Sequence, residues 1–570
     1  MYLRSIPRKG HAYWIVARAY RTEDRTAEQT LLYLGRLDGL SHIQVSDKLN
    51  NVRRLGDTIL LHEFETLLIR LGYPAPPPSL SEYDIRTVRS YGPEFVLVSI
   101  AQKLSVVTMI DEQGAKGGGP SLGRMTLALA IYAALRPGSV WRFVEWYARS
   151  PLPWFLEMPP DAVTYDAALN ALDYLQPERT AEWERVLYER IRELFNYSCE
   201  RIDIDSTVLE LEGTLCRLIA HFGRSKSGGV SRRRQILITF MLDQKSVLLG
   251  HEVFSGDRND AKTLKKVNRR LKGYDIPDAP RVVDRGYASM KNILTWKRRR
   301  EHFLAALKSK PKGLKLLDTL GTHTGWNVIG DGVYASSLIR DGLKWVVTWN
   351  DDVARRNGDG RRAKTEKAMN ELNTLSKSIG NGRVKSRSER DRKIGTILRK
   401  HGVKRFIQVK GGKGLAFTVT ETANVEKGES SDGYQVYVTT EKQMSDADIV
   451  QAYRSRDRIE KAIRTLKSCL GLGPVYLSTK EHVLGHVYVH ALAYQLRSVM
   501  ELRLKEGGIG MTAEQALWEL EKLQVAELIV RGDEIHAARK MSRMDGTTAS
   551  LMHLFSFGEE ATFPGVEGSI

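Results

Sequence analysis

A change of pattern near residue 201 constrains the fold of this chain more than any other feature of its sequence. Three apolar stretches with strand-like alternation come first, a helix pattern at about 260–271 follows, and a short strand at 281–284 then stops on an acid. The three stretches lie at residues 201–209, 235–242 and 247–253. Three strands followed by alternating helices and strands predict a mixed α/β sheet.

The remainder of the chain divides by composition into further expected units. Residues 1–75 predict a β-hairpin with a helical unit, bounded by the proline-rich loop at 74–78, and residues 76–198 predict a mainly helical region. The sheet begins in 199–309, and 446–504 is strongly helical. Between them, 310–445 has Gly-rich turns and short strands, which we expect to form a β-rich insertion outside the main sheet. In the small C-terminal region, 505–570, a helix opens at Thr512 with Gln515 placed for a capping box.

The charge of the chain favours a polyanionic partner. Lys and Arg exceed Asp and Glu by 87 to 68, a net +19, and 42% of the residues are hydrophobic, enough for a folded core. A basic protein without a nucleic-acid role is the alternative. Residues 381–405 hold ten Lys or Arg against two acids, a pattern typical of a solvated face or mobile loop, or of a DNA contact.

The cysteines and apolar stretches exclude several other classes. The three cysteines form no CxxC pair, which excludes a zinc ribbon and a disulfide framework and fits a reducing compartment. The start of the chain has no apolar signal stretch. The longest apolar run, near 125–135, is well short of the ~20 residues that span a bilayer. We therefore expect a cytoplasmic protein that has no membrane partner.

Acids occur where the predicted strands would otherwise be built for a core. Strand periodicity puts Asp203 and Asp205 on one face of the first strand, and Asp284 ends a later strand, where ligands of α/β sheets collect. Acids in such places are costly unless they are paired or bind metal. An edge strand with a solvated acidic face, and Asp284 as a helix N-cap, are the alternative interpretations.

A third acid lies on a predicted helix among cations. Glu460 shares one helical stripe with residues spaced three or four apart, and an apolar stripe runs beside it. The stripe comprises Tyr453, Arg456, Glu460, Arg464 and Lys467. One acid among cations beside a packed face suits phosphate and metal together. A surface network of i,i+4 ion pairs is the alternative.

Four residues of this segment and their spacings resemble the Y-R-E-K signature of bacterial insertion-sequence transposases of the DDE class. These residues are Tyr453, Arg456, Glu460 and Lys467. Asp205 in Asp-Ser-Thr resembles the first aspartate of that family, and Asp284 in Asp-Arg-Gly-Tyr the second, with Asp203 as the other candidate for the first. The long gap between Asp284 and Glu460 is similar to members with a β-rich insertion before the last helix.

This resemblance implies an RNase H-like catalytic domain, formed by 199–309 and 446–504 and interrupted by the insertion, that performs cut-and-paste transposition. Asp205, Asp284 and Glu460 would converge to hold two divalent metal ions, Mg²⁺ or Mn²⁺ as a substitute, which activate the attacking oxygen and stabilise the leaving one. Tyr453, Arg456 and Lys467 would contact phosphates. The resemblance implies two partners. One is double-stranded DNA, both the terminal inverted repeats of the element and the target, and the other is a second copy of the chain in the DNA complex. Residues 76–198 would help to recognise the ends of the element.

Three tryptophans are candidates for stacking on DNA, and two other functions are alternatives to transposition. The family is known for hairpin ends and for a flipped base stacked on Trp, and Trp326, Trp345 and Trp349 lie in the insertion, although buried core positions are the alternative for each. Another RNase H-like nuclease or resolvase would share the acids without joining strands. A domesticated or inactive relative would only bind DNA.

Overall fold

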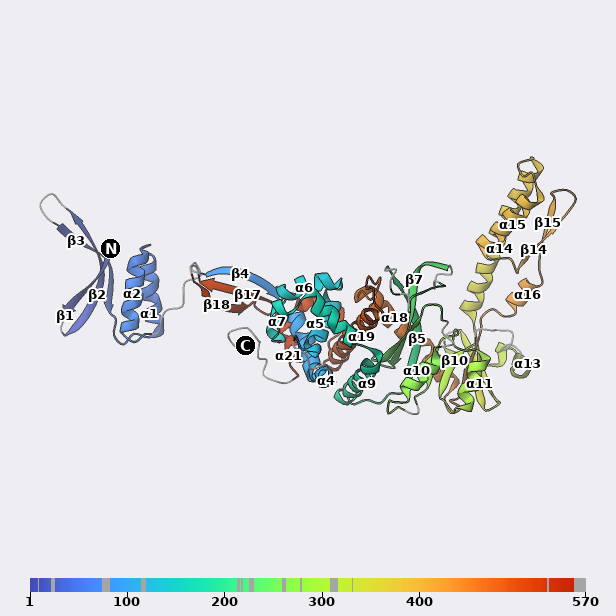
Figure 1. Ribbon diagram of the computed structural model, residues 1–570, viewed down its shortest axis with the longest axis horizontal. Helices are drawn as coiled ribbons and strands as arrows, with labels where there is room; N and C mark the ends of the chain where they lie inside the picture. Colours follow the sequence, from blue (N-terminus) through green and yellow to red (C-terminus); the bar gives the residue numbers. More distant parts are fainter. Residues whose placement is uncertain are drawn as a thin grey trace. The chain divides into compact units, whose positions relative to one another are not determined.

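The computed structural model describes residues 1–8, 10–21, 26–73, 83–113, 119–212, 216, 219–224, 230–258, 263–276, 279–307, 316–330, 332–530 and 533–557. The chain forms two compact units (Figure 1). One comprises Met1–Val88 with Ala526–Lys540, and the other comprises Arg89–Val525 with Met541–Ile570. The proline-rich boundary expected at 74–78 lies outside the described residues.

The first unit begins with three antiparallel strands, β1 (Tyr2–Arg8), β2 (His11–Arg21) and β3 (Thr26–Arg36), followed by α1 (His42–Arg53) and α2 (Thr58–Arg70). The pairing of β2 with β3 confirms the predicted hairpin, and β1 adds a strand to it. Ser41 and Gln44 form a capping box at α1. Val16 and Leu34 of the strands meet Phe64 of α2 in a small core. A second sheet pairs β4 (Tyr83–Ser90) with β17 (Gln524–Val530), which pairs with β18 (Asp533–Met541).

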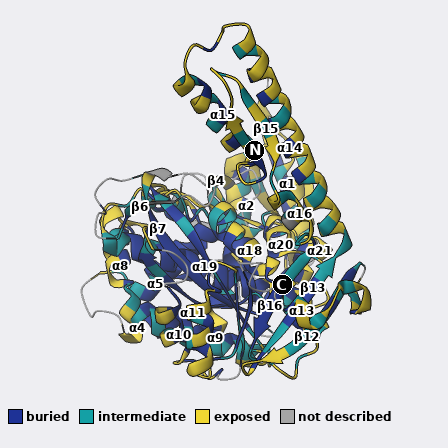
Figure 2. Ribbon diagram, turned by 90° about the vertical axis from the view of Figure 1, so that its right-hand side faces the viewer, coloured by how far each residue is buried: buried dark blue, intermediate teal, exposed yellow. Residues whose placement is uncertain are grey.

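The second unit has a helical layer built around one long helix, α19 (Lys480–Glu506), most of whose residues are buried. The helices that contact it are α3 (Gly92–Lys103), α5 (Leu122–Leu135), α8 (Tyr165–Tyr174), α9 (Pro177–Leu194), α20 (Ala513–Leu520) and α21 (Gly546–Phe555). Thr512 and Gln515 form the predicted capping box at α20. The helical layer and the sheet share one hydrophobic core (Figure 2), so the boundary expected at residue 198 does not separate two compact units.

The remaining helices of this layer are α4 (Val106–Gln113), α6 (Val140–Arg149) and α7 (Leu152–Phe155). Among the described helices, none is by itself long and apolar enough to cross a membrane; α3 and α4 meet that test of length and composition only as a pair, which is bent by 59°.

The sheet of the second unit contains the mixed topology that the sequence predicts. β5 (Ile202–Leu211) pairs antiparallel with β7 (Val230–Asp243), and β7 pairs antiparallel with β8 (Leu248–Ser255) and with the short β6 (His221–Arg224). On its other side β5 pairs in parallel with β9 (Arg281–Val283), which pairs in parallel with β10 (Phe303–Ala306). The predicted mixed α/β class is confirmed, with three antiparallel strands followed by two parallel ones, as expected for an RNase H-like sheet.

The same sheet continues into the region that we expected to lie outside it. β16 (Tyr434–Thr439) pairs with β10, then β13 (Leu343–Asn350) with β16, β12 (Val333–Arg340) with β13 and β11 (Asn327–Gly330) with β12. The expectation that every strand of 310–445 lies outside the main sheet is therefore wrong. The physical reason is that β10 would otherwise be an edge strand, and its unpaired backbone groups find partners in β16.

Residues 351–430, which join β13 to β16, form an arm that is mainly helical and not β-rich as expected. It consists of α14 (Asp351–Gly380), α15 (Arg387–His401), the hairpin of β14 (Ile407–Gly411) and β15 (Phe417–Glu421), and α16 (Asn424–Glu429). In the arm, Leu372 and Leu375 of α14 pack with Ile394 and Leu398 of α15 in a core of their own.

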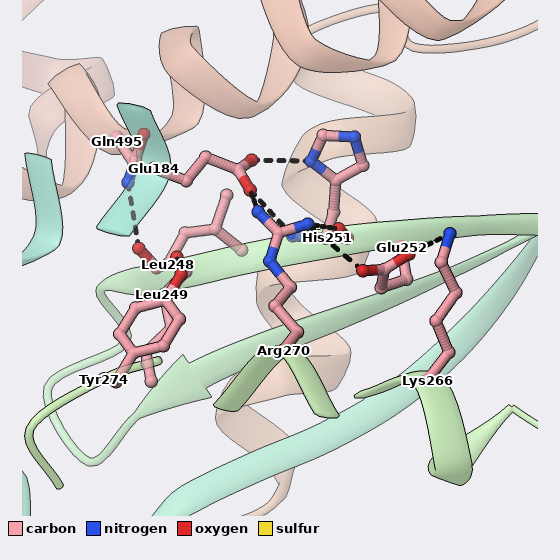
Figure 3. Close-up of polar contacts among 9 residues, drawn as sticks. All are labelled: Glu184, Leu248, Leu249, His251, Glu252, Lys266, Arg270, Tyr274 and Gln495. Carbon is pink, nitrogen blue, oxygen red and sulfur yellow. Dashed lines mark hydrogen bonds and ion pairs between the residues drawn. The ribbon is translucent and has the colours of Figure 1, made fainter. Parts of the chain in front are cut away.

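Side chains from three helices cover the backbone of β8 (Figure 3). Gln495 of α19 donates to the carbonyl of Leu248 at 2.9 Å, and Tyr274 to that of Leu249 at 2.5 Å. Arg270 of α10 (Leu264–Leu271) donates to the carbonyl of His251. The carboxylate of Glu184, on α9, accepts from the backbone N–H of His251 at 3.2 Å. Edge strands need such cover because unpaired backbone groups otherwise recruit other chains.

Glu184 is the charge centre of this arrangement. Its side chain is fully buried, and it binds the Arg270 guanidinium and the His251 ring, which lies at 2.6 Å. Burial raises the pKa of Glu184, but the charges of His251 and Arg270 outweigh burial, so the pKa lies below its usual value. The carboxylate therefore stays ionised inside the core.

We predict that Glu184→Gln lowers the free energy of unfolding by about 3–5 kcal/mol, because it leaves the buried Arg270 without its main counter-charge. Urea denaturation followed by tryptophan fluorescence measures this loss. The matched control is Glu182→Gln on the same helix; Glu182 pairs with Arg185 in partly exposed surroundings, and we expect a change within ~0.5 kcal/mol. Equal effects of the two substitutions would contradict the assignment.

Two histidines of α19, the buried His490 and the partly buried His486, lie beside each other with ring centroids 4.1 Å apart. A ring nitrogen of His486 lies 3.1 Å from the carbonyl of Leu472, and one of His490 lies 2.8 Å from the carbonyl of His486. Burial lowers the pKa of His486 to about 4, and burial together with the neighbouring His486 lowers the pKa of His490 well below its usual value. Both rings are therefore neutral in the folded protein.

We predict that His486 contributes stability above pH 6.5 that is lost as the pH falls toward 4. Between these pH values the unfolded chain binds a proton at His486 and the folded chain does not. The free energy of unfolding therefore falls by about 1.4 kcal/mol for each pH unit of acidification. The stability advantage of wild type over His486→Gln should thus shrink as the pH falls from 7 to 5, while other titrating groups cancel in the difference. Parallel pH profiles from urea denaturation would show that His486 titrates normally.

Candidate active site

The register of two parallel strands sets the position of the first two carboxylates. Asp203 of β5 pairs with Val282 of β9, and Ile204 pairs with Val283. One residue further along each strand stand Asp205 and Asp284. The two acids thus lie next to each other at the carboxyl end of β9, where Asp205 lies within the longer β5, although 79 positions separate them in the sequence. Ligands of α/β sheets collect at such ends.

Hydrogen bonds between the two motifs hold this arrangement. The hydroxyl of Ser206, which follows Asp205, contacts the hydroxyl of Tyr287, which belongs to the Asp284 motif. It also lies 2.6 Å from the Thr239 hydroxyl on β7. All three side chains are buried, so the bonds act in a medium of low polarity where a lost partner is costly. The sequence analysis quoted Ser206 and Tyr287 only as motif context and missed this bond.

Asp284 is half exposed and is held by two residues of the predicted signature. The Arg456 guanidinium donates to its Oδ1 at 3.2 Å, and the Tyr453 hydroxyl donates to the same atom at 3.3 Å. Burial opposes the ionisation of Asp284, but the charge of Arg456 and the hydrogen bonds outweigh it, so the pKa of Asp284 lies below its usual value. Asp284 is therefore a carboxylate at neutral pH.

Arg456 is a buried cation among acids. It is 5% exposed, and its pKa is raised because Tyr453 and the carboxyl groups of Asp205, Asp284 and Asp203 together outweigh the effect of burial. Its guanidinium thus balances the negative charge of the acids in the first half of β5 and at the end of β9. We expected Arg456 to contact phosphate; in the structure its polar contacts are with Asp284 and the Tyr453 hydroxyl.

The structure separates the two candidates for the first aspartate by their exposure. Asp203 is buried beside Arg201, 3.3 Å away, and burial raises the pKa of Asp203 to about 6. Asp205 is only partly buried, and its Oδ1 accepts from the backbone N–H of Ser206 at 2.8 Å. Asp205 is therefore the one of the pair that a ligand reaches from solvent.

The signature residues do not lie on one helix, which corrects the single stripe predicted above. Tyr453 is in the last turn of α17 (Asp446–Arg454), Arg456 caps α18 (Asp457–Arg464), which carries Glu460, and Lys467 lies in the π-helical turn Thr465–Cys469. The break falls at Ser455, whose hydroxyl donates to the carbonyl of Ala452 at 2.9 Å; short polar side chains compete in this way with helix backbone bonds.

Lys467 is bonded to β5, whereas Glu460 is exposed. Helix α18 contacts β5, and the Lys467 ammonium donates to the carbonyl of Val208 on that strand at 2.6 Å. Lys467 thus fastens the segment to the strand of Asp205. Glu460 itself is exposed on α18.

Of the three acids that we expected to converge, only Asp205 and Asp284 lie next to each other. In the described part of the chain, no group of three His, Cys, Asp or Glu side chains is arranged to hold a metal ion. Asp205 and Asp284 supply adjacent oxygen donors, which suit hard divalent cations, and the position of Glu460 as the third ligand stays a prediction.

The three candidate tryptophans have polar or stacking partners within the protein. Trp349 stacks on His323 with centroids 3.6 Å apart and donates to the carbonyl of Asp432 at 3.1 Å. Trp326 is 8% exposed and donates to the carbonyl of Leu320 at 3.0 Å, and Trp345 donates to that of Arg340 at 3.3 Å. Burial favours the core interpretation for Trp326, whereas Trp345 and Trp349 are only partly buried.

The chain is similar in sequence to a family of known proteins and is matched by a solved structure. A family described as "Transposase DDE domain" has a sequence model that matches residues 199–496, which span β5, β9 and α18. No curated protein matches the sequence. Among solved structures, a piggyBac transposase synaptic complex with hairpin DNA, determined by cryo-EM, aligns over 76% of this chain and 79% of that chain, with a TM-score of 0.37 and 8% identity. Because the family match covers more than half of its length, this chain belongs to the DDE transposase family.

Proposed function

We propose that this transposase cleaves DNA at the ends of an insertion sequence and joins the freed ends to target DNA, with Asp205, Asp284 and Glu460 as its catalytic carboxylates. The observation that carries the proposal is the pairing of β5 with β9, which sets Asp205 beside Asp284 within the matched domain. DDE transposases use divalent metal ions, and we propose Mg²⁺, with Mn²⁺ as a substitute. Such ions activate the attacking oxygen and stabilise the leaving oxygen of a phosphodiester.

Each residue of the site has a distinct role in this proposal. Asp205 and Asp284 offer neighbouring carboxylate oxygens where β9 ends, and Glu460, which is exposed on α18 beside β5, would supply the third carboxylate. Tyr453 and Arg456 orient Asp284 through its Oδ1, so they are positioning residues. Lys467 anchors the segment of Glu460 to β5.

The substrate and assembly follow from the same reasoning. DNA is the partner of the family, and a net +19 suits a polyanion. The spacing of Tyr453, Arg456, Glu460 and Lys467 supports assignment to the bacterial Y-R-E-K class. We propose that two copies of the chain hold the two terminal inverted repeats and the target, that residues 76–198 help to recognise the ends, and that the protein works in the cytoplasm.

We predict that Asp205→Asn and Asp284→Asn each reduce cleavage by more than about 100-fold, because even an indirect partner of a metal ligand is worth 10–100-fold. Binding to the ends should stay near wild type. A cleavage assay in Mg²⁺, run beside a fluorescence binding titration with DNA carrying the ends of the element, measures both. Wild-type cleavage by either variant would remove that aspartate from the site. Cuts without joined products in the wild-type reaction would instead indicate a nuclease.

Glu460 is tested by a matched pair on one helix. Glu460→Gln should abolish cleavage and leave DNA affinity unchanged, because it removes the charge that a metal requires and keeps the size of the side chain. Asp457→Asn is the control: Asp457 lies on α18, one turn before Glu460, and pairs with Lys461 at 3.3 Å. We expect the control to cleave like wild type. If both variants cleave normally, the third carboxylate lies elsewhere.

A further inference from the structure

The arm of residues 351–430 carries most of the excess positive charge of the chain. Residues 383–413 hold twelve Lys or Arg and two acids, a surplus of ten against the net +19 of all 570 residues. This segment includes α15 and β14. The catalytic residues proposed above lie outside it, and its core is separate from that of the sheet, so its surface charge needs another explanation.

The charges of α15 are sorted by face. Arg390, Ile394 and Leu398 are buried against the rest of the arm, and Arg392 and Arg399 are exposed on the opposite face of the helix. Gly395 lies between these two arginines on the same stripe, so that no bulky side chain separates them. Lys404 continues the exposed basic surface just beyond the helix.

Some cations of the arm are already neutralised and others are not. Lys400 pairs with Glu371 at 2.6 Å, Arg362 with Asp359 at 2.6 Å and Arg355 with Asp352 at 3.5 Å. Among the residues that the structure describes, Arg392, Arg399 and Lys404 form no ion pair with an acidic side chain. Exposed cations held close together without counter-charges repel one another and gain most from a polyanion.

The dimensions of this surface fit a duplex backbone. Helix α15 has 15 residues and is about 22 Å long. Along the axis of a duplex, each strand has one phosphate about every 3.4 Å, so a helix of this length runs beside several phosphates. A hollow of about 400 Å³ lies between α14 and α15, lined by Leu375, Arg392, Lys393, Thr396 and Ile397. Its apolar floor and basic rim suit a sugar with its phosphate.

We propose that the basic face of the arm, centred on Arg392, Arg399 and Lys404, is a second DNA-binding surface that grips the phosphate backbone without reading sequence. The proposal takes from the proposed function only that the partner is DNA, and it involves none of the catalytic carboxylates. A second copy of the same face is disfavoured as the occupant, because two surfaces of like charge repel.

The experiment compares two triple variants of the full chain that remove the same charge. The test variant is Arg392→Gln with Arg399→Gln and Lys404→Gln; the control is Arg355→Gln with Arg362→Gln and Lys400→Gln, whose cations are already paired. Affinity for a short fluorescent DNA duplex of arbitrary sequence is measured by anisotropy at several salt concentrations in EDTA. Circular dichroism checks that both variants are folded.

We expect the test variant to lose affinity and to flatten the dependence of log K on log salt by roughly 2–3 units, since each lost phosphate contact removes about 0.9. The control should change the slope by less than half as much. Equal slopes in the two variants would overturn the proposal, because net charge alone would then explain binding.

Because the assay contains no metal and requires no cleavage, its result does not depend on the assignment of Asp205, Asp284 and Glu460. If the catalytic assignment fails while the test variant still differs from the control, the arm remains a DNA-binding surface.

Discussion

The parallel pairing of β5 with β9 is the constraint on which the rest of the second unit depends. A parallel pair requires a crossover connection, and here β7, β8 and α10 lie between the two strands in sequence. Side chains of α9, α10 and α19 then cover β8. The chemistry at the strand ends therefore rests on a register fixed by buried backbone bonds. A shift of one residue would turn Asp205 to the other face of β5.

Charge balance at those strand ends explains why Arg456 is buried. Three aspartates gather around one guanidinium, and two of them, Asp205 and Asp284, are partly open to solvent. Carboxylates so close together would repel each other and bind protons more tightly without a nearby cation. Arg456 keeps Asp284 ionised from a position beneath the surface, whereas an exposed arginine would be screened by water.

The sequence predicted the parts of this protein that local pattern controls. Strand alternation located β5, β7 and β9, and the capping box at Thr512 was visible from two residues. Asp205 and Asp284 were noticed because acids on apolar strands are costly, and their convergence was expected from the resemblance to DDE transposases. Long-range pairing was beyond the pattern: nothing in 434–439 shows that β16 joins β10 rather than a separate domain. The helical period from Tyr453 to Lys467 also concealed a break, because the competing bond of Ser455 leaves the spacing unchanged.

The place where the arm joins the sheet has a consequence for how such a chain can be altered. β13 leads into the arm and β16 leads out of it, and the two strands are antiparallel neighbours, with the Asn350 N–H donating to the Gly433 carbonyl at 3.1 Å. Entry and exit therefore sit within one hydrogen bond of each other. A short turn could replace the 80-residue arm, or a foreign module could be grafted there, without altering the ladder on either side. The arm can thus be exchanged or removed while the strands of the sheet keep their pairing.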